Sequence, residues 1–166
     1  MKILVFDIDN TLIIHSNNSK SYYEKGCVTS NFRVLLESKN FERIYIYTNG
    51  TYGHGEAIVK HLGISDMISF IYARDNLKIA MEKEGPIQNG ENMKPHAKSF
   101  DYVHYSIITD VGTSDIEVYF FDDMKENMKT AHDRGWITYL TNPNETPDVY
   151  INYLFPNIYS ALLTHI

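Results

Sequence analysis

The chain opens with an apolar run, residues 3–6, that stops on two carboxylates, Asp7 and Asp9. The run predicts a buried β-strand, with both acids just beyond its carboxyl end. Acids two positions apart on an extended chain point to the same side, where their charges repel each other. In open α/β sheets the carboxyl ends of the strands form the edge that binds ligands. The opening residues therefore predict a strand of such a sheet and a site that needs paired acids.

Further apolar, β-rich runs alternate with stretches of helical spacing along the rest of the chain. The β-rich runs predict strands over residues 43–47, 68–72, 117–121 and 136–140, with a last edge strand over 149–151. Helical spacing predicts helices over residues 31–38, 55–62, 95–105, 124–134 and 158–163. Pro95 takes the first helical position of the third helix, and Gly63 and Gly135 lie just beyond the ends of two others. This alternation predicts an α/β fold, a Rossmann-like three-layer sandwich with a mostly parallel central sheet.

Length and charge narrow the class of protein. With 166 residues and no linker or internal repeat, the chain predicts a single domain over residues 1–166. The net charge of −6 argues against nucleic acid as a partner without excluding a local basic groove. Cys27 is the only cysteine, and no segment approaches the roughly 20 apolar residues of a membrane span. We therefore expect a cytoplasmic protein without a membrane partner, and homo-oligomerisation stays open.

Four polar elements occur in order, three of them at predicted strand ends. They are Asp7-x-Asp9-x-Thr11, Thr48 after the second strand, Lys94-Pro95, and Asp122-Asp123 after another apolar strand. A lone Asp-x-Asp is a weak signal, but four elements in register with a strand–helix alternation are hard to obtain by chance. Over nearly its whole length the chain therefore resembles the haloacid dehalogenase superfamily, and within it the phosphatases.

The residue types themselves favour phosphoryl chemistry. A carboxylate such as Asp7 can act as a nucleophile, which splits one difficult transfer into two easier steps. A second carboxylate such as Asp9 can move protons, a role typically worth about 10²–10⁴-fold in rate. Converging acids and a phosphate would repel one another, so a cation is expected, and oxygen ligands with room for water suit Mg²⁺.

The resemblance implies catalytic and metal-binding roles for three of the acids. Asp7 would be the nucleophile, forming an aspartyl phosphate, and Asp9 would be the general acid and base. The metal ligands would be the carboxylates of Asp7 and Asp122 and the backbone carbonyl of Asp9. In this superfamily the second Asp accompanies phosphatases and phosphotransferases, whereas dehalogenases lack it.

The resemblance also implies binding and supporting roles. Thr48, Asn49 and Lys94 would bind the phosphoryl oxygens. Asp123 would hold a metal-bound water or orient Lys94. Asn127 would either orient the metal loop or cap its own helix, and the sequence leaves both roles open.

Each of these residues also has an ordinary structural explanation. Thr48 or the Asp122-Asp123 pair can cap the helix that follows, and Lys94 can be a solvated surface lysine. Taken singly, those explanations suffice for Thr48 and Lys94, but together with the first motif the functional interpretation is favoured. The histidines show no grouping typical of zinc, which predicts surface or helix-packing roles for them: His54, His61, His96, His104 and His132.

Three stretches bring the chain closest to the pyrimidine 5′-nucleotidase-type members of the superfamily. Residues 48–66 resemble their second motif, and residues 94–100 and 121–127 resemble their third and fourth motifs. Those relatives carry a helical cap between the first and second motifs. Here residues 12–47 leave room for little more than one helix and one strand, so the cap is missing or reduced to a polar loop.

A reduced cap leaves the substrate open, because caps exclude water and select small substrates. A small phosphate monoester such as a nucleotide is the leading candidate. A phosphoprotein or a polynucleotide end is the alternative, and a binding or regulatory module with little turnover is the non-enzyme alternative. Segments 15–28 and 85–93 escape the strand–helix pattern and are candidate lids. Tyr22, Tyr23 and His15 in the first segment either contact substrate or pack within their own loop.

Overall fold

The computed structural model describes residues 1–14, 31–142 and 144–166. Six strands of these residues form one parallel sheet in the order β3-β2-β1-β4-β5-β6. The strands are β1 (Lys2–Phe6), β2 (Arg43–Thr48), β3 (Phe70–Ala73), β4 (Glu117–Asp122), β5 (Ile137–Leu140) and β6 (Tyr153–Leu154). The helices are α1 (Phe32–Glu37), α2 (Tyr52–His61), the 3-10 helix η1 (Ser65–Met67), α3 (Arg74–Glu84), α4 (Ala97–Val111), α5 (Lys125–His132) and α6 (Ile158–Thr164). The predicted α/β fold with a parallel central sheet is confirmed.

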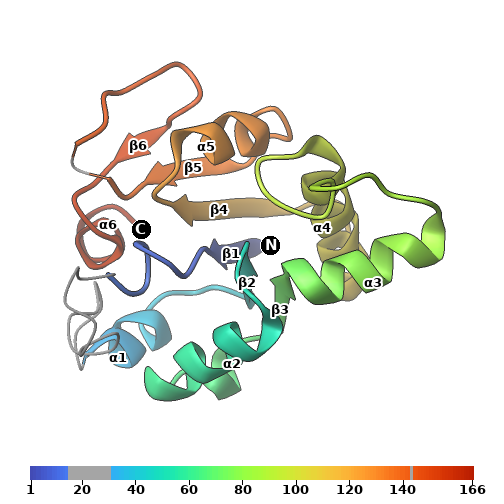
Figure 1. Cartoon of the computed structure of the whole chain (residues 1–166). Coiled ribbons are helices and arrows are strands. Elements are labelled where there is room, and N and C mark those ends of the chain that lie inside the picture. The colour runs from blue at the N-terminus through green and yellow to red at the C-terminus, as the bar shows by residue number, and fades with distance from the viewer. Residues whose placement is uncertain (15–30, 143) are drawn as a thin grey trace.

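The sheet lies between two layers of helices (Figure 1). Successive residues of β1 point to opposite faces, as the two-residue period of a strand requires. Leu4 and Phe6 belong to the same buried cluster as residues of α1, α2 and α6. Ile3 and Val5 belong to the cluster that includes residues of α3, α4 and α5. Both faces of β1 are therefore covered, which explains why its sequence is an unbroken apolar run rather than an alternating one.

Helix α2 begins and ends close to the expected positions. The chain turns at Gly63, whose φ of +67° is the left-handed backbone that glycine adopts without strain. At the other end, the Thr51 hydroxyl accepts a hydrogen bond from the His54 N–H at 3.3 Å. Thr51 therefore caps this helix, and the structural alternative that Thr48 caps it is wrong.

The helix expected over 95–105 begins later and runs further than predicted. It spans Ala97–Val111, and Pro95 is not its first helical residue. His96 precedes the first turn, and its ring nitrogen Nδ1 accepts a hydrogen bond from the Lys98 N–H at 3.2 Å. The helix starts after this capping residue rather than at the proline, because the cap supplies the partner that the first free N–H needs.

Two other expectations about elements are corrected. The edge strand predicted over 149–151 lies at Tyr153–Leu154, because Asn152 Oδ1 first accepts a hydrogen bond from the Thr138 N–H at 2.8 Å. The strand beside β5 therefore begins four residues later than the apolar pattern indicates. Helix α3 has no counterpart among the predicted elements. Leu77 and Met81 are its only buried residues, too few for a clear helical pattern.

The strands that follow β1 in the sequence are added first on one side of it and then on the other. The chain winds first through β2 to β3, then returns to β4 beside β1 and continues to β5 and β6. The boundary between β1 and β4 is thus the point where the strand order reverses. In sheets of this kind, ligands bind at that point, outside the carboxyl ends of the strands.

Two further expectations concern a membrane span and the loop after β1. None of the described helices is long and apolar enough to cross a membrane. The loop predicted over 15–28, with His15, Tyr22 and Tyr23, lies outside the described residues.

Candidate active site

The carboxyl ends of β2, β1 and β4 are neighbours, and each carries a polar side chain of the predicted site. Thr48 and Asp122 are the last residues of β2 and β4. Asp7 follows β1 directly, and its N–H donates to the Phe121 carbonyl at 2.9 Å, so β1 and β4 stay paired up to the acids. Thr48, Asp7 and Asp122 are all buried. The sheet therefore brings together polar residues that are far apart in the sequence.

Lys94 reaches the same edge from the loop before α4. Its Nζ lies 2.6 Å from Asp7 Oδ1 and 2.5 Å from Asp122 Oδ2, and its side chain is 1% exposed. The rings of Tyr47 and Phe120 lie with their centres 5.3 and 5.7 Å from Nζ. A charge removed from water is costly unless it is paired and hydrogen-bonded, and the two carboxylates supply both. Lys94 is therefore not the solvated surface lysine of the structural alternative.

Asn49 fixes the backbone of Lys94. Its side-chain Nδ2 donates to the Lys94 carbonyl at 2.9 Å, and its Oδ1 accepts from the Lys94 N–H at 2.8 Å. The loop after β2 and the loop before α4 are thus joined by two hydrogen bonds at one residue. Its Nδ2 carries a second N–H that these two bonds do not use, so the role of Asn49 in binding the phosphoryl oxygens stays a prediction.

Asp7, Asp122 and Asp123 form a cluster of carboxylates, one oxygen of each lying within 4.8 Å of the others. Burial raises the pKa of Asp7 to about 7; Lys94 opposes this rise, and the charges of Asp122 and Asp123 add to it. Burial also raises the pKa of Asp123 to about 6, with the charge of Asp122 as the next cause. Three acids face one ammonium group, so repulsion among the acids adds to the effect of burial on these pKa values.

The chemistry of this cluster fits a magnesium ion. Mg²⁺ takes oxygen ligands and is typically bound through one or two carboxylates together with waters and substrate phosphate. A dication would offset the negative charge that Lys94 leaves uncompensated among the three acids. The carboxyl group of Asp9 does not belong to the cluster, and the role of its backbone carbonyl as a ligand stays a prediction.

Asp122 is held in place by donors other than Lys94. Asn127 Nδ2 donates to both of its carboxylate oxygens, at 2.8 and 2.9 Å. The N–H of Met124, at the start of α5, donates to Oδ1 at 2.8 Å. Asn127 therefore contacts the predicted metal ligand Asp122 directly, which favours the orienting role over the capping role. The bond from the Met124 N–H also ties Asp122 to the start of α5, and its role as a metal ligand stays a prediction.

Asp9 lies on a tight turn after β1. The Ile8 carbonyl accepts hydrogen bonds from the N–H groups of residues 11, 12 and 13, at 3.2, 2.8 and 3.0 Å. This turn carries Asp9 away from the carboxylate cluster and toward α2. There, Asp9 Oδ1 lies 3.0 Å from His54 Nε2.

His54 is the residue of this region that the sequence reasoning missed. It was expected at the surface or in helix packing, but its ring contacts a predicted catalytic acid. The signal that could have found it is its position. His54 is the third residue of α2, and α2 starts four residues after Thr48, so its first turn lies beside the carboxyl end of β2.

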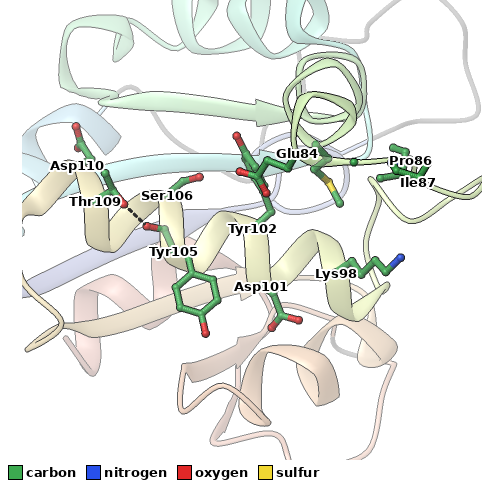
Figure 2. A pocket seen from close by; sticks show the side chains of 12 residues that line it. Glu84, Pro86, Ile87, Lys98, Asp101, Tyr102, Tyr105, Ser106, Thr109 and Asp110 are labelled. Atoms are coloured by element: carbon green, nitrogen blue, oxygen red, sulfur yellow. Dashed lines mark hydrogen bonds between the residues drawn. The ribbon is translucent and has the colours of Figure 1, made fainter.

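A groove of about 750 Å³ lies elsewhere, between α3 and α4 (Figure 2). Figure 2 shows Lys98 and Asp110 at the two ends of its α4 wall, with Tyr102 and Tyr105 between them. None of the predicted site residues lines this groove. Its lysine is paired with an acid outside the lining, since Lys98 Nζ lies 2.8 Å from a Glu91 oxygen.

No protein-family model matches the sequence, and no curated protein matches it. Solved structures share the fold. A hydrolase of the haloacid dehalogenase-like family from Streptococcus pneumoniae is similar with a TM-score of 0.59 at 15% identity, covering 97% of this chain and 96% of that one. The crystal structure of a dehalogenase is similar with a TM-score of 0.56 at 17% identity, covering 79% of this chain and 52% of that one.

A second dehalogenase structure, that of an intermediate complex, is similar with a TM-score of 0.54 at 16% identity, covering 80% of this chain and 54% of that one. The chain thus spans about half the length of the two dehalogenases and nearly all of the streptococcal protein. The architecture is that of haloacid dehalogenase-like proteins.

Proposed function

We propose that this chain, with its haloacid dehalogenase-like fold, is a Mg²⁺-dependent phosphomonoesterase that forms a phosphoenzyme on Asp7. The observation that carries the proposal is the buried contact of Lys94 with Asp7 and Asp122 at the carboxyl edge of the sheet. Buried charges are costly to a fold, and they cluster where a reaction handles charge. A phosphate monoester brings negative oxygens that a lysine and a metal ion between carboxylates can bind.

Asp7 is the nucleophile of the proposed reaction. One of its carboxylate oxygens bonds to phosphorus while the bond from phosphorus to the leaving-group oxygen breaks. Lys94, 2.6 Å from Asp7, and the Thr48 hydroxyl at the end of β2 bind the phosphoryl oxygens. Asp7, Asp122 and Asp123 would hold Mg²⁺, which when bound neutralises charge on those oxygens.

Asp9 moves the protons of the proposed reaction. It donates a proton to the leaving-group oxygen in the first half and accepts one from the attacking water in the second. Its position on the turn after β1, outside the carboxylate cluster, separates the proton-transfer group from the metal-binding groups. Asn49 contributes by fixing the backbone of Lys94.

Hydrolysis of an aryl phosphate tests this function. The wild-type protein with Mg²⁺ should release phosphate, excess EDTA should abolish the release, and added Mg²⁺ should restore it. Acid quenching during turnover should leave one phosphoryl group on the peptide that contains Asp7, detected by mass spectrometry. A protein that releases no phosphate with Mg²⁺, or that carries the phosphoryl group on another residue, would contradict the proposal.

Dehalogenation is the second candidate, because two of the similar structures are dehalogenases. In that reaction Asp7 would displace a halide from carbon, and a halide needs no proton as it leaves. The presence of Asp9 beside His54 favours the phosphatase, because a proton donor serves an oxygen leaving group. Halide release from a 2-haloacid, measured beside phosphate release from the aryl phosphate, separates the two reactions. Halide release alone would overturn the phosphomonoesterase.

The proposed substrate is a small phosphate monoester such as a nucleotide. A phosphoprotein or a polynucleotide end is the alternative, because the span between Asp7 and Thr48 is short for a substrate-selecting cap. A screen of nucleotides, sugar phosphates, phosphopeptides and phosphate-ended oligonucleotides, ranked by kcat/KM, decides between them. Tight binding of one of these ligands without turnover would favour the binding or regulatory module instead.

A further inference from the structure

The contact between His54 and Asp9 has little to do with stability. Nε2 of His54 lies 3.0 Å from Oδ1 of Asp9, and the two side chains are 31% and 33% exposed. A charged or polar pair with this exposure is screened by water and adds little to the free energy of folding. Its geometry is better explained by what Asp9 does than by what the pair contributes to the fold.

The local backbone allows these two side chains to meet. The His54 N–H donates to the Thr51 hydroxyl at 3.3 Å, which fixes the first turn of α2. Gly50 lies beside the contact. A Cβ at Gly50 would come 3.1 Å from His54 Cδ2, 3.2 Å from Thr48 Oγ1 and 3.7 Å from Asp9 Oδ2. The absence of a side chain at Gly50 thus lets the imidazole, the Thr48 hydroxyl and the Asp9 carboxyl group lie close together.

We infer that His54 is a positioning residue for Asp9, an inference that rests on the proposed phosphatase function. The imidazole holds Oδ1 of Asp9, so Oδ2 is the oxygen that serves proton transfer. In the first half of the reaction, the proton of Oδ2 moves to the ester oxygen as that oxygen leaves phosphorus and Asp7 bonds to phosphorus. In the second half, a water oxygen bonds to phosphorus, the bond to Asp7 breaks, and a proton of the water returns to Asp9.

Orientation matters here because proton transfer needs hydrogen-bond distance and alignment. The Asp9 side chain is one-third exposed, so the surrounding protein does not enclose it. The hydrogen bond from the imidazole therefore restricts the orientations of this carboxyl group to fewer than its exposure alone would allow. A misplacement of about 1 Å can lower a rate about 10²-fold, although the acid itself is still present.

The test compares two leaving groups in two variants of His54. His54→Leu removes the hydrogen bond, and His54→Gln keeps a polar group near the position of Nε2. Proton donation matters most for an alkyl phosphate, whose alkoxide leaves poorly, and least for 4-nitrophenyl phosphate. In His54→Leu we expect kcat/KM to fall about 10- to 100-fold for glycerol 2-phosphate and less than about threefold for 4-nitrophenyl phosphate.

His54→Gln should recover most of the activity on glycerol 2-phosphate. The inhibition constant of inorganic phosphate should stay within about twofold of the wild-type value in both variants, because His54 does not bind the phosphoryl group. His61→Gln, at the far end of the same helix, is the matched control and should change neither rate. Circular dichroism and thermal unfolding establish that each variant is folded.

Equal losses for the two substrates in His54→Leu, or no loss for glycerol 2-phosphate, would overturn the positioning role and leave the phosphatase proposal standing. A wild-type protein that hydrolyses neither substrate would instead overturn the phosphatase proposal, and the positioning role with it.

Discussion

The carboxyl edge of the sheet and the groove between α3 and α4 each hold a lysine near acids, but in different surroundings. The Lys94 side chain is 1% exposed, and its Nζ contacts carboxylates of both Asp7 and Asp122. The Lys98 side chain, four residues later, is 55% exposed and contacts one acid, Glu91. The groove has a volume of about 750 Å³, whereas at the edge the lysine and both of its acids are buried.

The two regions thus differ in buried charge as well as in size, and it is the buried charge at the edge that supports the proposed reaction there. Exposed ion pairs contribute about 0–1 kcal/mol, whereas removing one partner of a buried pair costs about 3–5 kcal/mol. The groove holds its charged groups at little cost because water solvates them. The edge holds its charges away from water, an arrangement that functional sites keep in spite of its cost to stability.

The largest expected effect is the loss of the nucleophile. Asp7→Asn should lower aryl phosphate hydrolysis by about 10⁴-fold or more, because an amide cannot form the phosphoenzyme. Asp101→Asn, in the lining of the groove, is the matched control and should stay within about twofold of the wild-type rate. Phosphate release under saturating substrate measures both. Similar losses in the two variants would remove the distinction between edge and groove.

The loss of the proton-transfer group should be the next largest effect. Asp9→Asn should lower kcat about 10²–10⁴-fold, because the amide can neither donate the proton nor take it back. Binding of inorganic phosphate, measured as inhibition, should change much less, because Asp9 stands apart from the carboxylate cluster. Equal losses in turnover and in phosphate binding would argue that Asp9 only shapes the site.

The two lysines should differ in what they contribute to stability. Lys94→Met should lower the free energy of unfolding by about 3–5 kcal/mol, because it leaves the buried Asp7 and Asp122 without their counter-ion. Lys98→Met should lower the free energy of unfolding by less than about 1 kcal/mol, because the lysine of this ion pair is exposed to water. Urea unfolding monitored by circular dichroism gives both values. If Lys94→Met were as stable as Lys98→Met, the buried acids at the edge would not need Lys94 as their counter-ion for stability.

The smallest expected effect is a pH dependence on helix α4. Trp136 Nε1 donates to His104 Nδ1 at 2.9 Å, a bond that needs the neutral ring. Burial lowers the pKa of His104; the charge of Arg134 also lowers it, and Asp101 opposes them. The unfolded chain binds the proton first, near the ordinary pKa of about 6.5, so this contribution to stability is complete above that pH and is lost as the pH falls below it.

The loss should be under about 1 kcal/mol, because solvent screens a partly exposed ring. His104→Gln keeps an acceptor for Trp136 but does not titrate, so its Tm should fall less than that of wild type between about pH 7.5 and about pH 5.5. His132→Gln is the control on α5 and should keep the wild-type dependence. An unchanged dependence in His104→Gln would exclude this histidine as its source.

The strand ends could be predicted from the sequence because their signal is local. The strands β1, β2 and β4 consist mainly of buried apolar residues, and the polar residues Asp7, Thr48 and Asp122 mark their carboxyl ends. The parallel fold then brings these ends to one edge, so the gathering of these polar residues could be predicted from the sequence.

The side-chain contacts could not be predicted, because they depend on distances across the fold. Nothing in the local sequence shows that Asn49 bonds to the backbone of Lys94, 45 residues away, or that His54 meets Asp9. The edge strand was displaced by one hydrogen bond between Asn152 and Thr138. Helix α3 has too few buried residues to show a helical period in its sequence. Its structure therefore depends on packing against the sheet and not on a pattern of apolar residues.

The two hydrogen bonds between Asn49 and Lys94 hold the lysine from the loop after β2, in addition to the loop that precedes it in the chain. Upstream, the Asn89-Gly90 turn lies at the surface, and Glu91 just after it is anchored to Lys98. Extra residues inserted at this turn would therefore lengthen the loop and leave the lysine in place. The turn is a point where a substrate-selecting domain could be grafted onto an unchanged reaction centre.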